Sequence, residues 1–225
     1  MSAVDPDALS ALIAARHSVR GFRPEPIARD VIDHLFTTAQ HAPSWCNIQP
    51  WRVAVTSPPR TDVVRAGLLA AARTGLPAPE LPFPIDYPSP YAEHRRACGV
   101  AVYEAMGIAK GDKAKRYDAW LRNFALFDAP HLAVVACDRR LGTYAALDVG
   151  VWLGILLTAA AALGIDTCPM ASVAAYPGAL RSLLPIADTD QILFGLAFGY
   201  RDPAVPANAA RTTREPLPSN VTFVT

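Results

Sequence analysis

The sequence predicts a globular domain in which helices surround a few buried strands, and three observations indicate this class. The 225 residues are enough to bury a sizeable core, and 52% of them are apolar while 18% are charged. Apolar residues recur at helical spacing in several segments. Two short runs, 132–136 and 192–198, are almost wholly apolar, which is typical of strands covered on both faces.

Two helices open the chain. Asp5 is a good N-cap and Pro6 suits the first helical position, so a helix is expected from there to Arg16. The segment 21–26 is a break. Apolar residues then fall four apart and predict a second helix that begins at residue 27 and ends near residue 41.

The middle of the chain is interrupted twice by proline. Two prolines within 42–51 exclude a regular helix or central strand and predict a loop dense in polar side chains. A strand at 53–55 and a helix from 61 to about 73 follow. Six prolines between 76 and 91 predict an extended arm. A linker between domains is the alternative, but helices resume at once, which favours an arm over one domain.

Two more helices are expected at 93–106 and at 112–127, and the second has an aromatic face that is more typical of core than of a pocket wall. The segment 144–163 predicts a long helix that is apolar nearly all round. Such a helix is typical of a central core or a subunit interface. We reject a membrane span, because no aromatic or basic belt flanks the helix.

The C-terminal third begins with a predicted turn at 168–172, followed by a short helix from 177 to 184. After the buried strand at 192–198 the chain becomes an extended tail. Apolar residues alternate with polar ones at 221–223, as in an edge strand. A strand at the end of such a tail would be able to pair with the sheet of a neighbouring subunit.

Composition excludes several classes of function. A net charge of +1 argues against binding nucleic acid, which needs a strong basic excess. The four cysteines are widely spaced and form no CxxC pair, so we expect reduced thiols and no metal site. No secretory leader is recognised, and we expect a cytoplasmic protein without a membrane partner. The high apolar content indicates that part of the surface is buried in an oligomer.

Four separate loops carry the candidate functional residues: 16–20, 43–51, 169–172 and 211–214. Two of them bring arginines, which suit a phosphate, and two bring polar groups with little bulk. Read alone, the basic stretch at 16–20 is more typical of a solvated helix end. The motifs of dinucleotide-binding folds, phosphate-binding loops, zinc proteases and nucleophile-elbow hydrolases are absent from the sequence. The four loops together suit a flavin mononucleotide (FMN).

Five motifs in fixed order extend over nearly the whole chain. They are Arg16-His17-Ser18-Val19-Arg20-Gly21-Phe22, Ala42-Pro43-Ser44-x-x-Asn47-x-Gln49-Pro50-Trp51, Ala162-Leu163-Gly164-Ile165 with Pro169, Phe198-Gly199-Tyr200 and Arg214-x-Pro216-Leu217. In these motifs the sequence resembles the FMN-dependent nitroreductase family. Within that family it is most similar to the nitroaromatic and nitrobenzoate reductases.

This resemblance implies an α+β fold in which helices surround a mixed central β-sheet. It implies one FMN-binding domain over residues 1–225, with the proline-rich arm at 76–91 and a C-terminal extension at 203–225 that lies on the partner subunit. The protein would be an intertwined homodimer with two FMN molecules at its interface.

The resemblance also assigns roles to residues. Arg16, Ser18 and Arg214 would hold the phosphate, with Arg211 assisting. His17 would lie along the ribityl chain and Arg20 at the pyrimidine edge of the ring. The remaining contacts would come from Pro43, Ser44 and Asn47 of the partner subunit and from Pro169, Met170, Ala171 and Ser172 near flavin N5. The family often has Glu-Gly where this chain has Ala171-Ser172, so the contact at N5 stays open. Either Arg122 or Asn123 would fill a further polar position.

The reaction that the resemblance implies is hydride transfer from NAD(P)H through flavin N5 to a nitroaromatic or similar electron-poor aromatic, with ping-pong kinetics and no catalytic side chain. We expect Phe83, Tyr87, Trp120 and Phe124 to form an apolar pocket for the aromatic substrate. The alternatives are a reductive dehalogenase or a quinone or flavin reductase on the same fold, and a non-catalytic FMN-binding protein.

Overall fold

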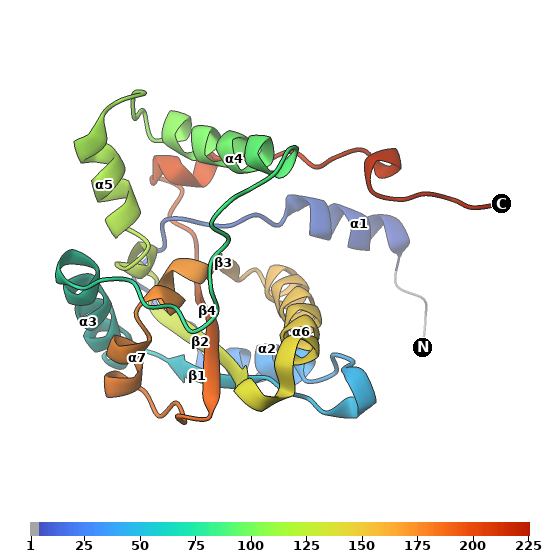
Figure 1. Cartoon of the computed structure of the whole chain (residues 1–225), viewed down its shortest axis with the longest axis horizontal. Coiled ribbons are helices and arrows are strands. Elements are labelled where there is room, and N and C mark those ends of the chain that lie inside the picture. Colours follow the sequence, from blue (N-terminus) through green and yellow to red (C-terminus); the bar gives the residue numbers. More distant parts are fainter. Residues whose placement is uncertain (1–4) are drawn as a thin grey trace.

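The computed structural model describes residues 5–225 and consists of helices packed around a small central sheet (Figure 1). The helices are α1 (Pro6–Ala15), α2 (Arg29–Ala39), α3 (Arg60–Thr74), α4 (Tyr91–Ala105), α5 (Lys113–Leu121), α6 (Gly142–Ala162) and α7 (Pro177–Leu183). The strands are β1 (Arg52–Thr56), β2 (His131–Asp138), β3 (Asp166–Met170) and β4 (Asp190–Gly199). The α+β class and most of the predicted elements are confirmed.

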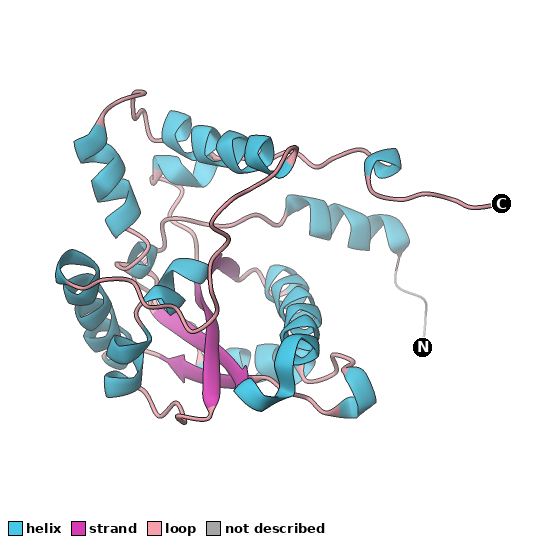
Figure 2. Ribbon diagram, in the orientation of Figure 1, coloured by secondary structure: helices cyan, strands magenta, loops and turns pink. Residues whose placement is uncertain are grey.

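The sheet has the strand order β1-β2-β4-β3, and its three neighbouring strand pairs within the described chain are antiparallel (Figure 2). The one parallel pairing recorded for the described residues is an isolated bridge between Ser18 and Thr167, beside β3. We expected a mixed sheet; within the described residues the four strands pair antiparallel, and the parallel pairing is confined to this bridge.

Helices cover both faces of the sheet. Residues of β2 alternate between two core clusters, because successive side chains of a strand point to opposite faces. Leu132 and Val134 pack with α3 and α7, whereas Ala133 and Val135 pack with α2 and α6. Figure 1 shows these helix pairs on opposite sides of the sheet, with α4 and α5 beyond one end. The wholly apolar run of β2 follows from this double coverage.

The turn predicted at 168–172 is wrong. Residues up to Met170 belong to β3, and a 3-10 turn follows at Ala171–Ala175. Cys168 and Met170 are buried and pair with β4, while Pro169 lies opposite Leu196. Proline is tolerated here because β3 is an edge strand, where one row of backbone N–H groups needs no sheet partner.

Two further predictions need correction. Helix α5 ends at Leu121 instead of about Phe127, because Leu126, Phe127 and Asp128 adopt positive φ angles that no α-helix continues through. The tail forms no strand at 221–223 within the described chain, and a single 3-10 turn at Leu217–Ser219 precedes this stretch.

Helix α6 lies against α2 and the sheet through one face, which includes Trp152 and Leu156. With the preceding turn it is the one helix among residues 5–225 that is long and apolar enough to cross a membrane. Its opposite face carries the exposed side chains of Tyr144, Leu147 and Val151. The helix is thus half core and half apolar surface, which fits the expectation of a core or interface helix.

Candidate active site

The segment Arg16–Arg20 leaves the end of α1 and runs along β3. The Val19 N–H donates to the Thr167 carbonyl at 3.0 Å, and the Val19 side chain is fully buried. Ser18 and Arg20 flank Val19 and are half-buried. The core residue Val19 thus fixes the backbone and leaves its polar neighbours on the opposite side. The pairing with β3 brings residues 16–20 next to residues 169–172. From the sequence we expected these two segments to lie at the same site.

Arg20 lies close to Cys168, and this contact bears on the chemistry of the thiol. Burial raises the pKa of Cys168 to about 11, against the opposing field of the Arg20 guanidinium. The thiol is therefore neutral at pH 7 and is no nucleophile. The Arg20 Nη1 donates to the Ser18 carbonyl at 3.2 Å and has no carboxylate partner within the described chain.

The structure distinguishes between Arg122 and Asn123. The Ser172 hydroxyl donates to the Asn123 side-chain oxygen at 3.4 Å, so Asn123 lies against the turn that follows β3. The Arg122 guanidinium pairs with the Asp128 carboxylate at 2.7 Å. Asn123 is accordingly the side chain of this pair that contacts the predicted site.

The C-terminal segment returns to Arg20. The Arg20 N–H donates to the Asn208 side-chain oxygen at 2.7 Å, and the Arg211 guanidinium donates to the Asn208 carbonyl at 2.8 Å. Arg214 donates to Thr212 in its own tail instead. Within one chain, Arg214 and Arg16 line separate clefts, so the predicted phosphate residues are only partly assembled.

The loop with Pro43, Ser44 and Asn47 lies at the other end of α6. The Trp45 N–H donates to both carboxylate oxygens of Asp148 at 3.1 Å, near the start of that helix. Arg16 and His17 lie beside residues 161–167, at the opposite end. Asp148 and Ala161 are 13 residues apart on α6, which corresponds to about 20 Å along the helix. One chain therefore cannot bring these two halves of the predicted site together.

The four predicted substrate residues are divided between two cavities and the core. Phe83 and Tyr87 line a cavity of about 420 Å³ with Ala171 and Ser172. Trp120 lines a neighbouring cavity of about 700 Å³. Phe124 is only 1% exposed and packs edge-on against Trp120, with ring centroids 4.8 Å apart. The assignment of Phe124 to the pocket surface is wrong, because Phe124 is a core residue that supports Trp120.

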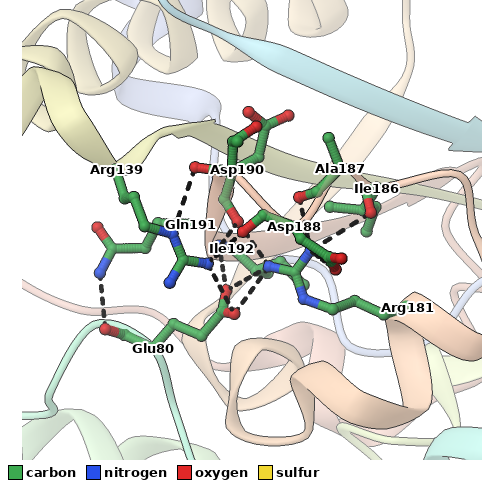
Figure 3. A network of polar contacts seen from close by, with 10 residues as sticks. Glu80, Arg139, Arg181, Ile186, Ala187, Asp188, Asp190, Gln191 and Ile192 are labelled. Atoms are coloured by element: carbon green, nitrogen blue, oxygen red, sulfur yellow. Dashed lines mark hydrogen bonds and ion pairs between the residues drawn. The ribbon is translucent and has the colours of Figure 1, made fainter.

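Glu80 anchors the proline-rich arm, and Figure 3 shows its polar contacts with α7 and the start of β4. Its carboxylate accepts from the Arg181 guanidinium at 2.7 and 2.9 Å and from the Ile192 N–H at 2.8 Å. Burial of Glu80 opposes ionisation, but the Ile192 hydrogen bond and Arg181 outweigh it and lower the pKa of this carboxyl. The Gln191 amide also donates to the Glu80 carbonyl at 2.6 Å.

The donor set fits a phosphorylated flavin. Near the 16–20 segment, the Nε2 atom of His17 is buried and has no hydrogen-bond partner among the described residues, and such atoms in native proteins commonly bind a ligand or water. No carboxylate in the described chain pairs with Arg16, Arg211 or Arg214. Within residues 5–225 no group of metal-binding side chains is present.

A model of the Nitroreductase family matches residues 13–200. The chain belongs to this family. It is 32% identical over 209 residues to a 4-nitrobenzoate reductase of Pseudomonas putida, covering 93% of this chain and 92% of the relative. A nitrobenzene nitroreductase of Ectopseudomonas oleovorans is 32% identical over 217 residues and 95% of each chain. The FMN-dependent nitroreductase NfnB of Mycobacterium smegmatis, in complex with NADPH, superimposes with a TM-score of 0.94 at 28% identity, covering 98% of this chain and 100% of that chain.

The sequence of this nitroreductase gave no sign of two features of the site. Glu80 was hidden among the prolines of the arm, since a single acidic residue in an extended segment reads as solvated. Arg95 and Arg96 of α4 line the cavity that Arg20 and Trp120 also line, and the sequence does not mark them, because charges on a helix are usually exposed to water. Both features depend on segments that are distant in the sequence, so no local pattern marks them.

Proposed function

We propose that this nitroreductase is an FMN-dependent enzyme that transfers a hydride from NAD(P)H to nitroaromatic or similar electron-poor aromatic substrates. The observation that carries the proposal is the edge of β3. There, the 16–20 segment, with arginines that are unpaired within the described chain and the unsatisfied Nε2 atom of His17, runs beside β3, and the Ala171–Ser172 turn that follows β3 lies in the cavity lined by the arm. The similarity to a solved FMN-dependent nitroreductase supports the same reading.

The chain's own residues bind and orient the cofactor. Arg16 and Ser18, with the tail arginines Arg211 and Arg214, would bind the phosphate, and His17 would lie along the ribityl chain. Charge-assisted hydrogen bonds from arginine suit phosphate because the guanidinium presents paired donors. Arg20 would contact the pyrimidine edge, where its positive charge stabilises the negative charge that reduction brings. Asn123 would add a polar contact beside Ser172.

Bound FMN would supply the hydride chemistry that links the reduced nicotinamide to the aromatic substrate. Phe83 and Tyr87 on the arm would cover whichever of the two substrates occupies the cavity beside Ala171 and Ser172. Because donor and acceptor would use the same place in turn, we expect ping-pong kinetics. We expect the enzyme to work in the cytoplasm.

The active unit would be a homodimer that assembles each site from both chains. The opposite positions of the 16–20 and 43–47 segments along α6 support this assembly. So does the exposed apolar face of α6, where Tyr144 and Leu147 are each 61% exposed. Two such faces would pack together and place the partner's 43–47 loop beside this chain's Arg16. The C-terminal extension at 203–225 would lie on the partner.

The first experiment measures colour and reduction. The purified protein should bind FMN, its visible absorbance should bleach on addition of NADPH or NADH, and a nitroarene such as 4-nitrobenzoate should restore it. Protein that stays colourless after incubation with FMN would contradict the proposal. Fast reoxidation by a halophenol or a quinone, but not by a nitroarene, would favour the alternative reductases. Bound FMN that neither donor reduces would indicate a non-catalytic flavin protein.

A second experiment tests the shared site. Arg16→Ala and Asn47→Ala are each expected to lose FMN and activity as homodimers. In a heterodimer of the two variants, both substitutions fall in the same site. The second site therefore keeps Arg16 from one chain and Asn47 from the other, and is intact. Mixed protein should therefore regain activity, whereas a site built within one chain would give no recovery.

A further inference from the structure

The larger cavity, of about 700 Å³, lies between α4, α5 and the segment that follows β4, and the flavin assignment uses little of it. Its volume is in the range of sites that bind cofactor-sized molecules. It adjoins the predicted flavin site, since Arg20 and Asn123 line it. Arg95 lines both this cavity and the smaller one beneath the arm, so the two are neighbours.

Five arginines line this single cavity: Arg20, Arg95, Arg96, Arg116 and Arg122. Among the described residues only Arg122 has a carboxylate within ion-pair distance, at Asp128. The other four place positive charge around one cavity without a carboxylate of the described chain to balance it, and Arg95 and Arg96 are exposed to solvent. An anionic ligand in the cavity would balance this charge.

Two of these arginines are held in place by aromatic rings. The Arg116 guanidinium lies over the Tyr103 ring at 4.7 Å, and its Nε atom is buried without a hydrogen-bond partner in the described chain. The Arg95 guanidinium lies over the Tyr87 ring at 5.1 Å. Stacking on a ring orients a guanidinium and leaves its N–H groups free to donate in the ring plane.

We propose that Arg95, Arg96 and Arg116 bind the 2′-phosphate of NADPH, and that the enzyme consequently prefers NADPH to NADH. The proposal rests on the function proposed above. With the nicotinamide under the arm beside Ser172, the adenosine end of the same molecule enters the larger cavity past Arg95. Trp120, also in the lining, offers an aromatic face to the adenine.

The number of charges favours a phosphate over the carboxylate of a substrate. A benzoate carries one negative charge, which a single arginine fork satisfies. A phosphate monoester carries about two negative charges and three strong acceptor oxygens at neutral pH. Three uncompensated guanidinium groups on α4 and α5 match the phosphate better.

The test compares the two donors on the FMN-loaded protein. Arg96→Gln and Arg116→Gln should each lower the ratio of kcat/KM for NADPH to that for NADH by roughly tenfold or more, the loss expected for one charge-assisted hydrogen bond. The matched control is Arg73→Gln, an exposed arginine at the end of α3, which should leave the ratio unchanged.

A binding measurement avoids turnover altogether. By calorimetry, adenosine 2′,5′-bisphosphate should bind the FMN-loaded protein at least roughly tenfold more tightly than adenosine 5′-monophosphate, and Arg116→Gln should abolish the difference. Equal affinity for the two nucleotides would overturn the proposal.

The outcomes separate this proposal from the proposed function. Bleaching by NADH and NADPH at equal rates would refute the 2′-phosphate site and leave the nitroreductase assignment intact, whereas bleaching by neither donor would refute both. A rise in KM for 4-nitrobenzoate but not for nitrobenzene in Arg96→Gln, with the donor ratio unchanged, would assign the cavity to a substrate carboxylate and overturn the proposal.

Discussion

The arm at 76–91 and the extension at 203–225 are both extended and rich in proline, yet they differ in the contacts that hold them to the rest of the described chain. The arm is tied within its own chain, since Glu80 binds Arg181 and Ile192, and the Ala78 N–H donates to the Ala175 carbonyl. The extension is tied as far as Arg211, and residues 211–225 are exposed throughout. Phe223 in this stretch is 77% exposed.

Proline content therefore predicts that both segments are extended, but it does not predict which surface each segment lies on. The Glu80 carboxylate is 19% exposed and accepts from three groups: the Arg181 and Arg139 guanidinium groups and the Ile192 N–H. These contacts fix the arm, because leaving such partners unsatisfied would be costly. Within residues 5–225 the final residues of the extension make one ion pair, between His94 and Glu215, and both side chains are nearly half exposed. Such a pair stabilises little. We infer that the arm is complete in one chain and that the extension becomes ordered on a partner.

The largest expected effect comes from removing the extension. A chain that ends at Ala210 should lose the dimer and bind FMN roughly 100-fold more weakly or worse, because two arginine contacts with the phosphate go with it. Size-exclusion chromatography and FMN titration measure the two losses. The full-length control Arg211→Gln/Arg214→Gln should lose FMN affinity but remain dimeric. A truncated protein that stays yellow and dimeric would contradict the comparison.

The next effect is expected at the anchor of the arm. Glu80→Ala should lower the free energy of unfolding by about 2 kcal/mol, because the mostly buried Arg181 loses its carboxylate. Cleavage by protease within 76–91 should become faster, and the KM for the aromatic substrate should rise. Glu25→Ala, at an exposed glutamate, is the matched control for urea unfolding. An unchanged protease pattern in Glu80→Ala would show that other contacts hold the arm.

The pH dependence of the anchor follows from its ionisation. The pKa of Glu80 is lowered from its ordinary value of 4.5, so the unfolded chain takes up a proton at higher pH than the folded chain does. The stabilisation is therefore complete above about pH 4.5 and is lost as the pH falls through the lower folded-state pKa. Urea unfolding between pH 3 and pH 6 should show this loss in the wild type and a weaker pH dependence in Glu80→Gln.

The smallest effect is expected from Arg139, which lies 3.4 Å from the Glu80 carboxylate and is 49% exposed. Arg139→Ala should cost less than about 1 kcal/mol, because solvent screens an exposed pair. Arg181→Ala should cost more, since the side chains of Arg181 and Glu80 are only 18% and 19% exposed. If the two variants lose the same free energy of unfolding, the solvent exposure of an arginine does not determine how much its contact with Glu80 contributes to stability.

Local patterns in the sequence were sufficient to predict most helices and strands of this nitroreductase. The Asp5–Pro6 cap, the four-residue spacing after Ile27 and the apolar runs of β2 and β4 act over a few residues, so one sequence reveals them. The motifs at 16–22 and 42–51 together indicated the family, because they depend on residue types at fixed spacing.

Which of these parts come into contact depends on how the chain folds in three dimensions. The tertiary structure made 166–170 an edge strand, since pairing with β4 outweighs the turn preference of Pro169. It buried Phe124, and it placed Asn123 rather than Arg122 against Ser172. It also gathered arginines from two helices around one cavity and separated the 16–20 and 43–47 segments along α6. The periodicity of apolar residues shows that a face is buried, but it does not show which distant segment covers that face, so contacts between distant segments are known only from the packed structure.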